Sequence, residues 1–156
     1  MASSPEARLK ELGLSLPPAG KPMAKYKMAV RVGNLLYLSG HGPAKISDKT
    51  PLSGRCGQDL TLEQGREAAR AVGLNMLATL RDQLGSLDKV KRLVKTLGLV
   101  NSTADFLDHP KVINGYSELM AEVFGEEAGV GARSAIGTNA LPGNIPVEIE
   151  AIFEVE

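Results

Sequence analysis

The sequence predicts an α+β fold in which two helices pack on one face of a mixed β-sheet, in the order β-β-α-β-α-β-β. Its length of 156 residues is close to the usual size of one domain. Two long segments place apolar residues at helical spacing, and five shorter segments are typical of strands. Because no internal repeat or low-complexity tract interrupts this order, residues 1–156 are expected to form a single domain.

Residues 1–22 are expected to form an N-terminal helix and a proline-rich extension. Ser4 followed by Pro5 is a helix-start signal, and Gly13 suits the end of the helix. Three prolines between residues 17 and 22 fix φ and lack the amide donor, so this stretch should run extended.

A β-hairpin is predicted after this extension. Residues 28–32 and 35–39 read as two strands joined by the two-residue turn Gly33-Asn34. The segment that follows, residues 40–57, is rich in glycine and proline and is expected to be a loop. Loops of this kind often border functional sites.

The two helices are predicted at residues 62–84 and 110–124. Thr61 and Gln64 fit a capping box at the start of the first helix. The second helix opens at a proline and ends before a glycine. Between them, residues 90–100 are apolar enough for a largely buried strand.

The last two strands, residues 133–139 and 147–155, are expected to pair as a hairpin. In that pairing, Arg133 and Glu148 share one face of the sheet, with their backbones roughly 13 Å apart. Two long side chains could then approach one small ligand between them. A shift of one residue would place them on opposite faces, and on spacing alone a solvated charged face is the simpler explanation of the same residues.

Composition argues against several classes of function. The 18 Lys and Arg residues balance the 18 Asp and Glu residues, which disfavours nonspecific binding to nucleic acid or to an anionic membrane. The single cysteine, Cys56, excludes an internal disulfide and a cysteine-built zinc site, and it fits the cytoplasm. His41 and His109 lie too far apart to suggest a metal pair, so no metal is expected. No apolar run is long enough to cross a membrane.

One layer of helices leaves the other face of the sheet without a cover. Self-association is the usual way to cover such a face, so a homo-oligomer is expected.

Several motifs resemble those of the Rid family, the reactive intermediate imine deaminases, which is also called the YjgF-like or RidA family. The resemblance covers roughly residues 23–155 and rests on four stretches: Tyr26, Gly33-Asn-Leu-Leu-Tyr-Leu-Ser-Gly40, Ala132-Arg-Ser-Ala-Ile-Gly137 with Leu141-Pro142, and Val147-Glu-Ile-Glu-Ala-Ile152. The N-terminal helix, the long 42–57 loop and residues 112–117 look more like a divergent branch of the family that is labelled endoribonuclease.

The resemblance implies a chorismate mutase-like fold, a homotrimer, and small-molecule clefts between subunits. It implies a cofactor-free reaction in which a reactive enamine or imine is hydrolysed to a 2-oxo acid and ammonia. Arg133 matches the arginine that binds the substrate carboxylate, and Glu148 matches the acid that handles the attacking water. Tyr26 and Ser39 match residues of the substrate pocket.

Two departures from the family pattern bear on substrate range and mechanism. Ala135 stands where many members have a cysteine, so a mechanism here cannot require that thiol. Lys25 and Lys27 flank Tyr26 and add positive charge at the pocket entrance.

Two alternatives to the deaminase are left open by the sequence. The first is a noncatalytic module that binds a 2-oxo acid. The second is an endoribonuclease, which the neutral net charge and the absence of Trp make the weaker of the two.

Overall fold

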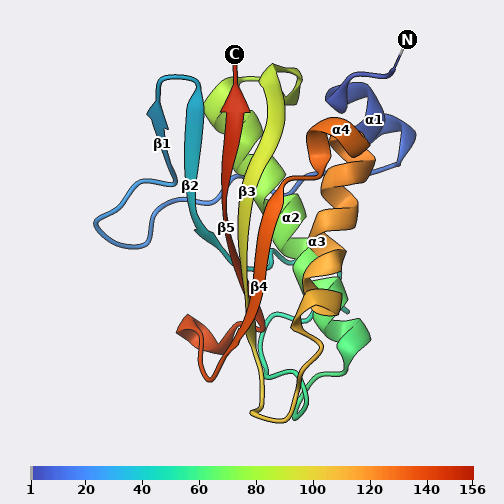
Figure 1. Ribbon diagram of the computed structural model, residues 1–156, viewed down its shortest axis with the longest axis vertical. Coiled ribbons are helices and arrows are strands. Elements are labelled where there is room, and N and C mark those ends of the chain that lie inside the picture. The colour runs from blue at the N-terminus through green and yellow to red at the C-terminus, as the bar shows by residue number, and fades with distance from the viewer. Residues whose placement is uncertain (1) are drawn as a thin grey trace.

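A five-stranded mixed sheet with helices packed on one face makes up the structure, a computed structural model that describes residues 2–156 (Figure 1). The strands lie in the order β1-β2-β5-β3-β4. They are β1 (Ala29–Val32), β2 (Leu35–His41), β3 (Val90–Asn101), β4 (Ala132–Thr138) and β5 (Val147–Val155). The helices are α1 (Pro5–Glu11), α2 (Leu62–Leu84), α3 (His109–Phe124) and α4 (Glu126–Gly129), with the 3-10 turns η1 (Leu87–Lys89) and η2 (Pro142–Asn144). This arrangement confirms the predicted α+β fold and the order of its main elements.

The N-terminal arm is tied to the helical layer by Glu6. Its carboxylate accepts hydrogen bonds from Arg81 of α2, at 3.0 Å from Nε and 2.6 Å from Nη2, and from the backbone amide of Leu87 at 3.0 Å. Leu9 on the same helix is buried in the core. The predicted cap is present, because the Ser4 hydroxyl accepts from the amide of Ala7. The arm therefore packs as part of the fold.

The long helix α2 begins where the capping box predicts. The Thr61 amide donates to Gln64 Oε1 at 2.9 Å, and the Gln64 amide donates to Thr61 Oγ1 at 3.2 Å. The helix ends at Gly85, whose φ of 82° is the left-handed conformation that favours glycine. These two ends fix the length of the helix that covers the sheet.

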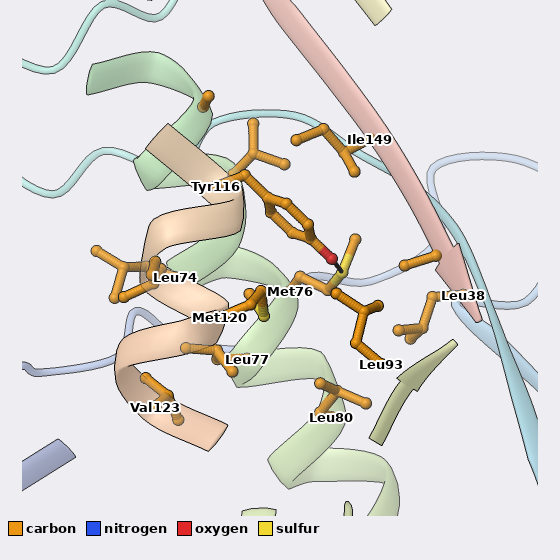
Figure 2. Packing of buried hydrophobic residues seen from close by; sticks show 14 of the residues in the cluster. Leu38, Leu74, Met76, Leu77, Leu80, Leu93, Tyr116, Met120, Val123 and Ile149 are labelled. Atoms are coloured by element: carbon orange, nitrogen blue, oxygen red, sulfur yellow. Dashed lines mark hydrogen bonds between the residues drawn. The ribbon is translucent and has the colours of Figure 1, made fainter. Parts of the chain in front are cut away.

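Helices α2 and α3 cross closely over the core. A Cβ atom at Gly115 would lie 2.1 Å from the carbonyl oxygen of Arg66, so only glycine permits this backbone approach. Behind the crossing, Tyr116 donates a hydrogen bond to Met76 Sδ at 3.3 Å, among the leucine and methionine side chains drawn in Figure 2. The dense packing fixes the position of α3 against α2.

The pairing of the last two strands differs from the prediction. Strand β4 pairs in parallel with β3, and β5 lies between β2 and β3, antiparallel to both. The predicted hairpin of residues 133–139 with 147–155 is therefore wrong. The reason lies in burial: every second residue of β5 is buried, whereas no residue of β4 is fully buried. The more apolar strand takes the centre of the sheet, and the polar one takes its edge.

We expect Glu6→Gln to lower the free energy of unfolding by about 1 kcal/mol, because it weakens hydrogen bonds to a partly exposed arginine and to a backbone amide. The hydrogen bonds from Arg81 hold the pKa of Glu6 below its ordinary value of 4.5. The difference in the free energy of unfolding between wild type and variant should therefore reach its full size above pH 4.5. It should vanish as the pH falls through the pKa of Glu6 in the folded state. Urea denaturation at several pH values measures it. Glu11→Gln, which alters an exposed pair with Arg8, is the matched control and should change little.

Candidate functional site

Glu148 lies on the face of the sheet that the helices leave open. It is half-buried, and its neighbours Val147 and Ile149 point to the core. The register between β2 and β5 shifts between Leu38 and His41. This bulge brings Gly40 against the carboxyl group, so that a Cβ atom at position 40 would lie only 2.9 Å from Glu148 Oε1. Glycine at position 40 therefore makes the room that the carboxyl group occupies.

The surroundings of Glu148 favour its protonated form. Burial raises its pKa above the ordinary value of 4.5, and the negative charge of Glu150 on the same face raises it further. A carboxyl group in this state can take up and release a proton closer to neutral pH than an exposed one.

Ser39 precedes Gly40 in the chain and lines a hollow of about 630 Å³ on the open face, together with Tyr37, Lys95 and Glu150. Its hydroxyl donates to the carbonyl oxygen of Lys27 at 2.6 Å. Its own carbonyl oxygen accepts from Nδ1 of the buried His41, also at 2.6 Å. Both contacts hold the bulge in place and position Ser39 at the wall of the hollow.

Arg133 projects from the edge strand β4 toward helix α3. Its Nη1 donates to Asn114 Oδ1 at 2.8 Å and to Ser117 Oγ at 3.2 Å, and its Nη2 lies 3.5 Å from the carbonyl oxygen of Pro110. Among residues 2–156, no carboxylate lies within ion-pair distance of this guanidinium. Neutral acceptors thus fix the group while its positive charge stays available to an anion.

The prediction that Arg133 and Glu148 share a face is wrong for a single chain. Arg133 pairs with Thr96, whose side chain is buried under the helices, whereas Glu148 pairs with Leu99, which lies on the open face. The two residues also stand on strands separated by β3, about 10 Å apart across the sheet. One chain therefore presents them on opposite faces.

Tyr26 lies farther still from Arg133. It precedes β1, the strand at the opposite edge of the sheet from β4, and 45% of its surface is exposed. Its hydroxyl oxygen accepts a hydrogen bond from the Met23 amide at 3.4 Å. A single chain thus leaves Arg133 on the edge strand β4 and Tyr26 next to the opposite edge strand β1, with both strands labelled in Figure 1.

The supporting residues of the site were missed in the sequence. Asn114 and Ser117 hold Arg133, and their spacing of three residues on a predicted helix was the available signal for a shared polar face. Gly40 makes room for the carboxyl group of Glu148. Only the register of β2 against β5 shows the role of Gly40.

Neither a metal cluster nor a reactive thiol is found in residues 2–156. No cluster of three or more His, Cys, Asp or Glu side chains there could hold a metal ion. Cys56 is buried, and burial raises its thiol pKa to about 11, which leaves it protonated near neutral pH. Within the same range, no helix has the length and apolar character to cross a membrane.

Comparisons with known proteins agree with this architecture. The family model described as "YjgF/chorismate_mutase-like, putative endoribonuclease" matches residues 6–150. The chain is 40% identical to protein TCP17 of Trypanosoma cruzi over 149 residues, which cover 96% of this chain and 92% of that one. It is 30% identical to a 2-iminobutanoate/2-iminopropanoate deaminase of Dermatophagoides farinae over 92% of this chain and 95% of that one.

A solved structure extends the likeness to three dimensions. The protein Atu1372 from Agrobacterium tumefaciens, described as having unknown function, superposes with a TM-score of 0.87 at 42% identity. The match covers 97% of this chain and 92% of that one. The two chains therefore share their fold over nearly their full length.

Titration of the side-chain carboxyl carbons by NMR should find the pKa of Glu148 above that of an exposed glutamate. Replacing its charged neighbour, Glu150→Gln, should lower the pKa of Glu148, because one of the two causes of its rise is removed. Glu127→Gln changes an exposed residue in another element and should leave the pKa of Glu148 unchanged. A Glu148 pKa that does not respond to Glu150→Gln would contradict this account of the site.

Proposed function

The chain belongs to the YjgF/chorismate mutase-like family, and from this membership we propose that it is a cofactor-free deaminase that hydrolyses reactive enamine or imine intermediates to a 2-oxo acid and ammonia. Membership confirms the resemblance and the chorismate mutase-like fold that the sequence indicated. The observation that carries the proposal is Glu148, a half-buried carboxyl group with a raised pKa on an open sheet face. A group of this kind suits proton transfer to and from water.

The proposed site is built from two copies of the chain in a homotrimer. Arg133 on the edge strand of one copy would meet Glu148 and Ser39 on the open face of the next, which accounts for their separation within one chain. Support comes from the apolar side chains exposed on that face and at its edges, which are Val30, Val32, Tyr37 and Ile136. Exposed apolar surface of this kind favours a protein partner, and a copy related by symmetry is the usual one.

In the proposed reaction Arg133 binds the substrate carboxylate. Its contacts to α3 use Nη1 and one side of Nη2, so the edge formed by Nε and the other side of Nη2 can donate two parallel hydrogen bonds. These two hydrogen bonds would orient the reacting carbon of the substrate toward the Glu148 carboxyl group of the neighbouring copy. Lysine could supply the charge but not the paired donors.

Glu148 would move the protons. After the enamine has tautomerised to the imine, water adds to the carbon of the C=N bond while the Glu148 carboxylate takes one of its protons. The acid then returns that proton to the nitrogen of the resulting carbinolamine. The proton of the hydroxyl group then passes through Glu148 to the same nitrogen, the C–N bond breaks, and ammonia leaves as the C=O bond of the 2-oxo acid forms. No oxidant or reductant is consumed in this sequence.

A second candidate, a module that binds a 2-oxo acid without turning it over, is favoured by one observation. The hollow of about 240 Å³ beside Arg133 is lined by residues of a single chain, among them Asn114, Ser117 and Gly131. A carboxylate could be bound there without any contribution from Glu148. Binding that is unchanged in Glu148→Gln, with no turnover in the wild type, would support this candidate over the deaminase.

Glu148→Gln should lower kcat by about 10²- to 10⁴-fold, because the amide cannot take the proton from water. Arg133→Ala should instead raise KM strongly. The assay generates 2-iminobutanoate in place with an amino-acid oxidase and follows its loss. Glu154→Gln, on the same strand and face, is the control and should keep most of the activity. Activity that survives both Glu148→Gln and Arg133→Ala would refute the site.

Mixing the two inactive variants tests whether the site is shared between copies. If Arg133 and Glu148 come from different chains, co-expressed Arg133→Ala and Glu148→Gln subunits should recover about a quarter of the sites in random trimers. Each recovered site pairs an intact arginine from one chain with an intact glutamate from another. If both residues of a site come from the same chain, mixing should recover nothing. The mass in solution, measured by light scattering, shows which assembly is present.

A further inference from the structure

A second polar hollow lies at the end of the sheet where β3 and β4 finish side by side. The two strands are parallel, and their last paired residues are Asn101 and Thr138. The hollow has a volume of about 290 Å³ and is lined by the loop that follows β3, the end of β4 and the first residue of α3. These three segments lie at the bottom of Figure 1. Carboxyl ends of parallel strands are a common place for ligands in α/β proteins.

Arg55 supplies the positive charge of this hollow. Its Nη2 donates to the carbonyl oxygen of Ser102 at 2.7 Å, while its Nε is buried and has no hydrogen-bond partner among residues 2–156. Within the same residues no carboxylate lies within ion-pair distance of its guanidinium. Buried donors are nearly always satisfied in folded proteins, so an unpaired N–H in a cationic hollow indicates a missing acceptor.

Uncharged and basic side chains complete the lining. His109 Nε2 lies 3.1 Å from the hydroxyl oxygen of Ser102, and its ring packs edge-on against Phe106 with 5.7 Å between ring centres. No acidic side chain lines the hollow. Three carboxylates lie nearby without lining the hollow: Asp59 accepts from the backbone amide of Arg55, Asp108 pairs with Lys111, and Asp105 is exposed, with its pKa lowered by the hydroxyl of Thr103. The hollow is thus electropositive.

Gly137 keeps the hollow open. A Cβ atom at this position would lie 2.3 Å from Nε2 of His109, so a larger residue would push against the ring. The backbone of Gly137 has no positive φ, so its conformation alone does not require glycine. The open space in front of His109 therefore depends on the missing side chain.

We propose that this hollow is a binding site for one small oxyanion, a carboxylate or a phosphate group, held by Arg55 together with Ser102 and His109. The volume suits a ligand at the small end of the usual range. The site is separate from the one proposed above, because Gly137 stands four residues from Arg133 along β4, about 13 Å away, and the two hollows share no lining residue. Anion binding in this hollow does not depend on the deaminase reaction.

The test is an NMR titration of the ¹⁵N-labelled full chain with inorganic phosphate and, separately, with sodium acetate, at constant ionic strength. Saturable shifts are expected at the amides of residues 102–104 and 137–139. Arg55→Gln, which removes the charge, and Gly137→Ala, which narrows the hollow, should each raise Kd by about tenfold or more. Arg133→Gln should leave Kd unchanged, so failure of the deaminase proposal would not affect this result.

Each outcome decides the proposal. Saturation by phosphate alone identifies a phosphate site, and saturation by acetate alone identifies a carboxylate site. The proposal is overturned if neither ion saturates, if both variants bind as the wild type does, or if Arg133→Gln abolishes binding. Melting temperatures check that the variants fold. Should Arg55→Gln unfold, Gly137→Ala, which keeps every charged group, decides the question.

Discussion

A sheet with two faces and only one layer of helices is the constraint on which the rest of this structure depends. Helices α2 and α3 cover one face and pack closely against each other at Gly115. The other face carries exposed apolar side chains beside Glu148 and Glu150. Burying that face against a neighbour would remove apolar surface from water and, at the same time, desolvate the carboxyl groups. In the proposed assembly, association and chemistry would therefore be linked through the same surface.

The local elements could be predicted from the sequence, whereas the pairing of the strands could not. Capping at Thr61 and Gln64 and the alternation along residues 147–155 are local signals, and the structure confirms both. The choice of neighbours in the sheet depends on which strands bury the most surface across the whole molecule. The succession of β4 and β5 along the chain suggested a hairpin, but the apolar character of β5 places it in the centre of the sheet.

The candidate site shows the same division between local and distant information. Arg133 and Glu148 stand in recognisable motifs, so their identity was accessible from the sequence. Their relative placement was not accessible, because its prediction rested on the incorrect pairing of β4 with β5. The role of Gly40 depends on a bulge opposite another strand, and the roles of Asn114 and Ser117 depend on a helix that packs near the edge of the sheet. Such supports come from tertiary packing and leave little trace in a single sequence.

The position of β4 at the rim of the sheet has a consequence for handling the protein. Its outer side presents backbone amide and carbonyl groups that no other strand in residues 2–156 pairs with, and its exposed Ile136 adds an apolar contact. Edges of this kind are templates for the addition of foreign strands. A variant engineered to stay monomeric would keep this edge bare and would be prone to aggregate. Charged substitutions facing outward on β4 would be needed to keep such a variant dispersed.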